Sequence, residues 1–600
     1  MRDDRFVMRP IHWIALLGSL VAAAGLKVWL VAGGRVPFNA DEAVVALMAQ
    51  HILQGQRPLF FYGQAYMGSL DAYLIAAGFN WFGEQVWVIR GVQTILYLGT
   101  LLTTAFVGRA ALGSWRAGVL AAWFLAIPTV NVTLYTTSSL GGYGEMLLIG
   151  NLILLVGLSI ARGFTRGQGR ITGWLWVSLG FLVGLGLWVF GLTLVYSLPV
   201  LVFLLWTIWK NVPFHTRRAG LKVLALPVCL LTLGFMVGAL PWGIYAAANG
   251  FGALLAELTG SAIAGVENTS FLNEVVQHTF NFVLFGGTVI AGLRPPWGVE
   301  WLAQPLLPVA LAFWLGVIVF TTVQLYKSAN LPLRVEHTRL RVAEMNLHEI
   351  SARAPFTSSL NAITEYETRK GQAINPSKST NGAFLLAGVG LILVVGFITT
   401  PFGADPSGRY FIPIAVIMAL FAAQAVMRLR DSYGRWAWGL VLIVLGFNLW
   451  GTVQAAQRVP PGLTTQFDAQ TRIDHRYDFD LIAFLEAEGE MRGYSNYWIS
   501  YPLAFQSGER LIFVPRLPYH RDLSYTSRDD RYAPYQKLVA AAGRVAYITG
   551  DQPELENHIR KGLATLRVDW QEKGIGDYRV FYKLSRVVRP GELGLGGELD

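Results

Sequence analysis

The chain has almost none of the cysteine on which disulfide-linked and many metal-binding proteins depend. Cys229 is the only cysteine in 600 residues, and it lies inside an apolar run. It forms no intrachain disulfide and supplies no cysteine spacing for a metal site. Charge is also scarce, since Asp, Glu, Lys and Arg make up 14% of the chain while 53% is hydrophobic. A mean hydropathy of +0.43 argues against a soluble multidomain protein and indicates that the bilayer is its solvent.

Several functional motifs are missing. The sequence contains no G-x-x-x-x-G-K-[ST] loop and no H-E-x-x-H helix, so an ATP-driven pump and a zinc protease find no support. The apolar segments hold few interior charges, whereas a proton or ion relay requires chains of them. The formal net charge is +10. The basic residues nevertheless occur in short tracts between apolar segments, which is typical of membrane topology signals and does not favour nucleic acid as a partner.

Long apolar segments dominate what is present. A membrane span needs roughly 20 predominantly apolar residues, and about eleven segments are of that size. They are 11-33, 87-108, 117-134, 145-161, 171-187, 189-209, 223-247, 301-326, 383-401, 410-427 and 436-454. The first is too long for a signal-peptide core, so we expect a retained span. The fifth and sixth are nearly continuous: two spans require a tight turn near Trp188, and one long helix would invert every later orientation.

Charge asymmetry supports the division into two spans. Lys and Arg concentrate in alternate connections, so the positive-inside rule places the N-terminus in the cytoplasm and the tail outside. We expect a polytopic, mainly α membrane domain over 1-455, with a first outer loop at 34-86 and a partly disordered cytoplasmic insertion at 328-382. The tail, 456-600, alternates helix-like pieces (FDLIAFLEAEG, APYQKLVAAAG) with strand-like pieces (RLIFVP, RVAYITG), which predicts a small extracytoplasmic α/β domain. A plasma membrane of prokaryotic type suits this pattern.

The first outer loop contains the sharpest local feature, FNADE, where the chain leaves the membrane. Two helix-like stretches follow, AVVALMAQHILQG and YMGSLDAYLIAAGFNWFG, each apolar on one side and suited to lying at the membrane surface. Asn39 or Asp41 fits a helix N-cap and Glu42 a first-turn acid, both ordinary structural placements. Carboxylates at the rim of a membrane are costly and tend to face a cavity, so Asp41 and Glu42 are equally candidates for catalysis.

Other candidates lie on the same side of the membrane. Glu145 follows a Ser/Gly-rich turn and has a simpler explanation as a first-turn helix acid. Arg90, Arg294 and Arg409 break the outer pattern; each alone is explained by snorkelling to lipid headgroups, whereas several together form an anion site. A further group beside the acidic pair is suited to binding a sugar, although anchoring at the membrane surface explains its tyrosines equally well: Tyr62, Gln64 and Tyr66.

No metal cofactor is expected. The outer loops before the tail have no D-x-D or His cluster of metal-ligand type, and the DFD in the tail fits a helix start. A divalent metal is not excluded by this absence.

The arrangement resembles the GT-C superfamily of membrane glycosyltransferases, in the protein-mannosyltransferase and aminoarabinose-transferase branch. The matching features are the acidic pair Asp41 and Glu42 after the first span, the loop GQAYMGSLDAY, Arg90 opening the second span, Glu145 in the second outer loop, and the Arg409-Tyr410 pair before a late span. The resemblance covers roughly residues 10-455. It implies a polyprenyl-phosphate sugar donor and a first-loop aspartate as general base, which assigns the role to Asp41 with Glu42 as rival. An insertion like 328-382 is not a feature of the family.

The function implied is transfer of a sugar from a polyprenyl-phosphate donor to a hydroxyl of a glycan, lipid or protein. One base and a set of cations suffice for such a transfer, because the phosphate leaves without a general acid once its charge is held. A glycosidase requires two carboxyls at a defined separation, a role open to Asp41 and Glu145. A flippase of lipid-linked sugars is the main alternative and predicts internal repeat symmetry, which the sequence does not show clearly. A membrane-anchored binding protein that works through its tail is the third.

Overall fold

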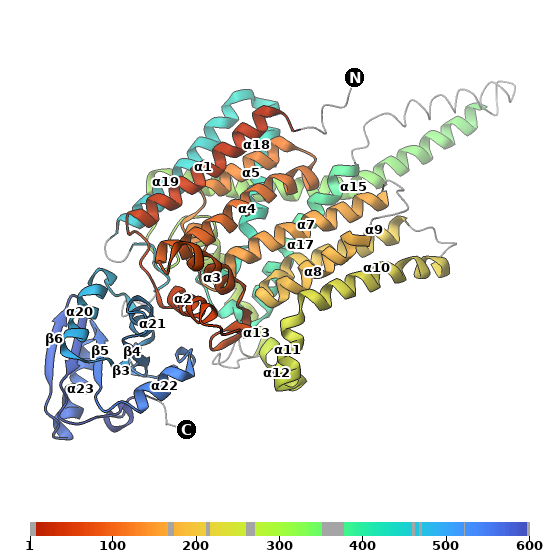
Figure 1. Cartoon of the computed structure of the whole chain (residues 1–600). Coiled ribbons are helices and arrows are strands. Elements are labelled where there is room, and N and C mark those ends of the chain that lie inside the picture. Colours follow the sequence, from red (N-terminus) through yellow and green to blue (C-terminus); the bar gives the residue numbers. More distant parts are fainter. Residues whose placement is uncertain are drawn as a thin grey trace.

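The computed structural model describes residues 8–165, 173–211, 217–259, 270–350, 377–458, 462–466, 471–520 and 522–596. These residues form a bundle of long apolar helices followed by a small α/β domain, as the sequence predicts (Figure 1). The C-terminal domain, in blue, lies against the end of the bundle that carries the short helices α2 (Ala40–Leu53) and α3 (Leu70–Phe82).

Helices cover each of the predicted apolar segments. In chain order the helices of the bundle are α1 (Pro10–Ala32), α4 (Val86–Leu112), α5 (Trp115–Ala126), α6 (Val130–Tyr135), α7 (Tyr143–Thr165), α8 (Gly173–Val189), α9 (Leu194–Asn211), α10 (Arg217–Gly238), α11 (Leu240–Asn249), α12 (Phe251–Thr259), α13 (Phe271–Phe280), α14 (Gly287–Ile290), α15 (Leu307–Ile350), α17 (Ser377–Thr399), α18 (Ile414–Tyr433) and α19 (Ala437–Gln457). Of these, α12, α13 and α14 lie between two of the predicted segments. Helix α15 continues through the first part of the predicted insertion 328-382, and residues 351–376 lie outside the described residues.

The predicted number of eleven spans is not confirmed. Within the described residues, seven helices are long and apolar enough to cross a membrane, or eight if α10 and α11, which meet at a bend of 64°, form one span. Two further predicted spans correspond to the shorter apolar helices α5 and α8. Helices α18 and α19 lie together in a single apolar stretch of 44 residues.

The boundary between α8 and α9 confirms the predicted turn near Trp188. A short 3-10 turn, η1 (Gly191–Thr193), separates the two helices. Helices α8 and α10 pack very closely. A Cβ added at Gly180 or Gly234 would lie 1.9 or 2.1 Å from a backbone oxygen of the other helix, so only glycine fits at these two positions. Small residues permit such contacts inside a membrane, where lipid tails remove the hydrophobic drive for helix association.

The first outer loop differs from the expectation of two surface helices. The prediction for α2 is wrong, because every residue from Glu42 to His51 is buried, and α2 packs against α3 and against α21 (Tyr497–Gln506) of the C-terminal domain. Helix α3 does expose Trp81 and Phe82 at its end. The segment before α3 forms a hairpin of β1 (Phe60–Phe61) and β2 (Gln64–Gly68), so Tyr66 lies on a strand and not on a helix.

The C-terminal domain is built on a five-stranded sheet. The strand order is β4-β3-β5-β7-β6, with α20 (Asp478–Glu488), β3 (Arg492–Ser495), β4 (Ile512–Pro515), α22 (Ala533–Ala540), β5 (Ala546–Gly550), α23 (Pro553–Thr565), β6 (Gln571–Ile575) and β7 (Tyr578–Tyr582). Strands β3, β4 and β5 are parallel, whereas β7 pairs antiparallel with β5 and β6. The chain leaves β3 for a neighbour on one side and returns to a neighbour on the other, which makes its carboxyl end a topological switch point, where α/β sheets commonly bind ligands. Helix α21 begins directly after this strand.

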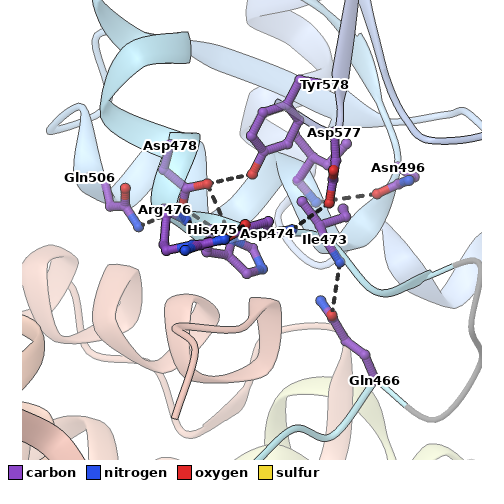
Figure 2. A network of polar contacts seen from close by, with 11 residues as sticks. Gln466, Ile473, Asp474, His475, Arg476, Asp478, Asn496, Gln506, Asp577 and Tyr578 are labelled. Atoms are coloured by element: carbon purple, nitrogen blue, oxygen red, sulfur yellow. Dashed lines mark hydrogen bonds and ion pairs between the residues drawn. The ribbon is translucent and has the colours of Figure 1, made fainter. Parts of the chain in front are cut away.

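A polar network holds the entry into this domain (Figure 2). Asp478 opens α20, as the DFD pattern predicts. Its carboxylate accepts hydrogen bonds from Gln506 Nε2 at 3.0 Å and from Tyr578 Oη, and lies 3.1 Å from His475 Nδ1. These contacts connect the segment directly before α20, which contains His475, with α20, α21 and β7. They therefore fix the position of α21 relative to the sheet.

Candidate active site

The acidic pair lies in the first turn of α2. Asn39 Oδ1 accepts a hydrogen bond from the backbone N–H of Glu42 at 3.0 Å, which confirms Asn39 as the N-cap. Asp41 and Glu42 therefore occupy positions that the helix dipole favours for acidic side chains. Successive residues of a helix point about 100° apart, so the two carboxylates face different surroundings.

Glu42 faces the interior and pairs with an arginine of α4. Its side chain is fully buried, and its two carboxylate oxygens accept from Arg90 Nε at 3.1 Å and Arg90 Nη2 at 3.0 Å. A buried, bidentate pair of this kind gives each carboxylate oxygen a donor and places the two opposite charges against each other. Arg90 was expected to contribute to an anion site and Glu42 to be a possible base, but the structure engages them with each other.

Asp41 remains partly exposed and faces the C-terminal domain. Its Oδ1 accepts a hydrogen bond of 2.5 Å from the hydroxyl of Tyr497, the first residue of α21. Burial and the neighbouring carboxylate of Asp41 raise the pKa of Tyr497 well above its ordinary value, so the hydroxyl keeps its proton and acts as donor. Among the hydrogen bonds of the described residues, Asp41 Oδ2 has none.

Arg531 of the C-terminal domain reaches the same place. Its side chain is buried, its guanidinium lies 5.3 Å from the centre of the Tyr497 ring, and it lies within electrostatic range of Asp41. With its amide oxygen toward Arg531, Gln64 accepts from Nη2 at 2.8 Å and Nη1 at 2.6 Å. Gly63 permits this approach, since its φ is +68° and a Cβ there would lie 3.0 Å from Arg531 Cδ.

Tyr66 connects this group with Arg409. It lies within electrostatic range of Asp41, Arg409 and Arg531, and burial raises its pKa. Arg409 pairs with Asp405 at 2.6 Å, stacks over the Tyr410 ring at 4.9 Å and keeps its side chain 41% exposed. Of the predicted site residues, the structure therefore brings together Asp41, Gln64, Tyr66 and Arg409.

Tyr62 has a different environment from the one expected. Its hydroxyl contacts His51 Nδ1 at 2.9 Å and its ring stacks on Tyr532 of the C-terminal domain at 4.7 Å. His51 Nε2 lies 3.0 Å from Glu509, which also accepts from Tyr535 Oη at 2.7 Å. We call these five residues the His51 cluster. Tyr62 belongs to this docking contact between domains, not to an open sugar-binding surface.

Glu145 is buried in the first turn of α7, which fits its interpretation as a helix-start acid. Gln93 Nε2 lies 3.4 Å from Glu145 Oε1 and from Ser139 Oγ, and Ser139 donates to Asp71 Oδ2 at 3.1 Å. Burial raises the pKa of Asp71 above its ordinary value. No hydrogen bond of the described residues joins this group to Asp41.

Arg294 is satisfied by the chain around it. Its guanidinium donates to Thr288 Oγ1 at 2.9 Å and to the carbonyls of Phe285 and Gly298 at 3.0 and 2.9 Å. These bonds engage the Arg294 guanidinium within its own segment of the chain, so its role is structural.

The described part of the chain contains no group of three or more His, Cys, Asp or Glu residues arranged to hold a metal ion. The expectation of a metal-independent site stays a prediction.

Asp529 gives the C-terminal side of this region a pH dependence. Burial raises its pKa to about 6. A carboxyl whose pKa is raised by folding binds its proton more tightly in the folded state, so stability falls as pH rises from about 4 to about 6. We expect Asp529→Asn to remove this loss, which is on the order of 2 kcal/mol. Thermal unfolding in detergent at pH 4.5 and pH 7.5 measures it; an equal difference between variant and wild type at both values contradicts the assignment.

Solved structures share this architecture. ArnT from Cupriavidus metallidurans, in complex with undecaprenyl phosphate, aligns over 96% of this chain and 99% of its own at a TM-score of 0.53 and 12% identity. The oligosaccharyltransferase AglB from Archaeoglobus fulgidus, in complex with an inhibitory peptide and a dolichol-phosphate, aligns over 92% of this chain and 71% of its own at a TM-score of 0.50 and 12% identity. The chain shares the fold of these two proteins, in agreement with the fold that the resemblance to the GT-C superfamily implies. No protein-family model matches it, and neither does any curated protein sequence.

Within this GT-C-like fold, the partners that the C-terminal domain supplies to Asp41 had not been expected. Tyr497 and Arg531 are separated from Asp41 by more than 450 positions, and neither stands in a recognisable motif. The sequence offered one signal for Tyr497, which is that a helix begins directly after a strand. That signal is hard to recognise, because the strand β3, with the sequence RGYS, has only a weak strand pattern.

Proposed function

We propose that this protein transfers a sugar from a polyprenyl-phosphate-linked donor to an acceptor hydroxyl at the outer face of the membrane, with Asp41 as general base. The observation that carries the proposal is the state of Asp41: partly exposed, held at Oδ1, and without a partner at Oδ2 among the described residues. Asp41 and Arg409 both lie within electrostatic range of Tyr66. The GT-C fold supports the reaction class. The predicted topology puts this face outside the cytoplasm of a multi-pass plasma membrane protein.

The arrangement fits the requirements of the reaction. Asp41 Oδ2 takes the proton of the acceptor hydroxyl, and the acceptor oxygen forms a bond to the anomeric carbon. The bond from that carbon to the phosphate oxygen breaks, and the polyprenyl phosphate leaves with the electron pair. Tyr66 and Gln64 offer a ring face and an amide beside the carboxylate for the sugar.

Arg409 is the group best suited to the phosphate. It is partly exposed, and its ion pair with Asp405 uses only part of a guanidinium that has five N–H donors. Charge on the leaving phosphate is stabilised by such a cation without a proton donor. Arg90, engaged by Glu42, is not part of this proposal.

Labelled sugar transfer tests the function. Purified protein in lipid is supplied with a panel of polyprenyl-phosphate sugars, and product formation is compared with movement of the same donors across the bilayer. Transfer to an acceptor supports the proposal. Movement of donor without transfer identifies a flippase, and neither process with any donor rejects this donor class.

Replacement of Arg409 is expected to act on the donor. Arg409→Ala removes charge-assisted contacts with the phosphate and should raise the donor KM by about ten-fold or more. Arg409→Lys keeps the charge but lacks the paired N–H donors of the guanidinium, so its donor KM should lie between those of the wild type and Arg409→Ala. Arg435→Ala, at an exposed arginine of the turn η8 (Gly434–Trp436), is the matched control. An unchanged donor KM in Arg409→Ala contradicts the assignment.

A further inference from the structure

Two of the contacts between the C-terminal domain and α2 of the membrane domain involve polar residues, and they use different sets of residues. The His51 cluster joins α2 to Glu509, Tyr532 and Tyr535 through stacked rings and hydrogen bonds. It contains no residue that touches Asp41. The second set consists of Tyr497 and Arg531, which lie at Asp41 itself. The His51 cluster therefore joins the two domains without involving Asp41. The placement of Tyr497 and Arg531 at Asp41 requires a different explanation.

The fold directs Tyr497 at Asp41. Strand β3 ends at Ser495, and Asn496 caps α21 by accepting from the backbone N–H of Ile499 at 3.2 Å. Tyr497 is the first residue of that helix and is 3% exposed. Since α21 packs on α2, the first turns of both helices bring the phenol and the carboxylate together.

Arg531 is held in place by neighbours on both sides. Its backbone N–H donates to Tyr501 Oη at 2.5 Å, and Tyr501 in turn donates to the carbonyl of Asp529 at 3.1 Å. On the other side, the hairpin of the first outer loop receives its side chain through Gly63 and Gln64. The guanidinium thus lies over the Tyr497 ring, between the C-terminal domain and the hairpin.

We propose that Tyr497 and Arg531 are positioning residues, by which the docked C-terminal domain fixes the orientation of the Asp41 carboxylate. This inference rests on the proposed function, in which Asp41 is the base. The Tyr497 hydroxyl occupies Oδ1 and directs Oδ2 toward the acceptor. The site in the membrane domain is incomplete until the C-terminal domain is docked.

Several charged or titratable groups act on Asp41 and enter any pH experiment. They come from α21, from the segment that precedes α22, from β2 and from α6, and are Tyr497, Arg531, Asp529, Tyr66 and Tyr135. The three tyrosines have pKa values raised by burial and stay neutral. Asp529, with a pKa of about 6, titrates within the pH range of these experiments, so each experiment is repeated in Asp529→Asn.

The test compares Tyr497→Phe with Tyr547→Phe. Both remove the hydroxyl of a buried tyrosine in the C-terminal domain, but Tyr547 donates to the carbonyl of Val588 and makes no contact with Asp41. A hydrogen bond donated to a carboxylate favours its charged form. Loss of Tyr497 Oη should move the acidic limb of the kcat/KM profile upward by about half to one pH unit, lower kcat about ten-fold, and leave the donor KM unchanged. Arg531→Ala should move the limb in the same direction, and Arg531→Lys less.

A second readout does not depend on turnover. Carbodiimides react with protonated carboxyls, so the pH dependence of labelling at Asp41, measured by mass spectrometry of its peptide, follows its protonation. The midpoint should move upward in Tyr497→Phe and not in Tyr547→Phe. If the midpoint shifts in Tyr497→Phe but the wild-type protein transfers no sugar, the positioning contact is supported and the proposed function is rejected. An unshifted midpoint, or equal profiles for both variants, overturns the inference.

Discussion

Asp41→Asn is expected to lower sugar transfer by about a hundred-fold to ten-thousand-fold, the range that a general base contributes. Asparagine keeps an oxygen that accepts from Tyr497 Oη, so the contact between the domains survives while the base is lost. The variant should therefore bind the donor with an unchanged KM and unfold at the temperature of the wild type. Initial rates over a range of donor concentrations, together with thermal unfolding in detergent, separate these effects.

The control for this substitution is Asp480→Asn. Asp480 is also an acid in the first turn of a helix, but it is exposed on α20 and contacts no residue of the proposed site. Its replacement should leave transfer unchanged. Transfer that persists at the wild-type rate in Asp41→Asn contradicts the role of Asp41, and loss of transfer together with loss of folding assigns Asp41 a structural role instead.

The neighbouring carboxylate should behave in the opposite manner. Glu42→Gln leaves the Arg90 guanidinium buried without its counter-charge, which costs about 3 to 5 kcal/mol in comparable buried pairs. We expect a strongly lowered unfolding temperature and poor recovery of folded protein in detergent. The protein that remains folded should transfer sugar at a rate near that of the wild type, because the carboxylate takes no part in the chemistry.

A double-mutant cycle tests whether the loss of stability comes from the unpaired charge of Arg90, or whether any substitution in this loop destabilises the protein. Glu42→Met combined with Arg90→Met removes both charges, and should be more stable than either single variant, since no buried charge is left unpaired. Glu554→Gln, at an exposed first-turn position of α23, should leave the unfolding temperature unchanged. Additive losses in the double variant, or abolished transfer in folded Glu42→Gln, contradict the structural assignment.

Part of the site could be predicted because it depends on local physics. Asn39 before two acids marks a helix start, and the structure confirms the cap. The turn near Trp188 follows from the length that one bilayer permits, and it too is present. The strand-like pieces RLIFVP and RVAYITG of the tail contain β4 and β5, because alternating and β-branched residues favour pleated structure.

Other assignments failed where tertiary packing overrode a local pattern. Helix α2 has the pattern of a surface helix, yet α3 and α21 pack against it and most of its residues are buried. Arg90 and Arg409 look alike in sequence as outer-rim arginines. One is matched by a buried carboxylate and the other is left partly exposed, and only the positions of the surrounding helices decide which.

The sequence by itself determined that this chain spans a membrane, that it carries an α/β domain at its C-terminal end, and that an acidic pair opens the helix after its first span. These features follow from hydropathy, charge placement and capping, which act over a few residues. Which of the two acids is available for chemistry was decided by the tertiary structure alone. Adjacent helix positions face directions about 100° apart, and the partners that fill those directions, Arg90 for Glu42 and Tyr497 with Arg531 for Asp41, come from distant segments that no local pattern specifies.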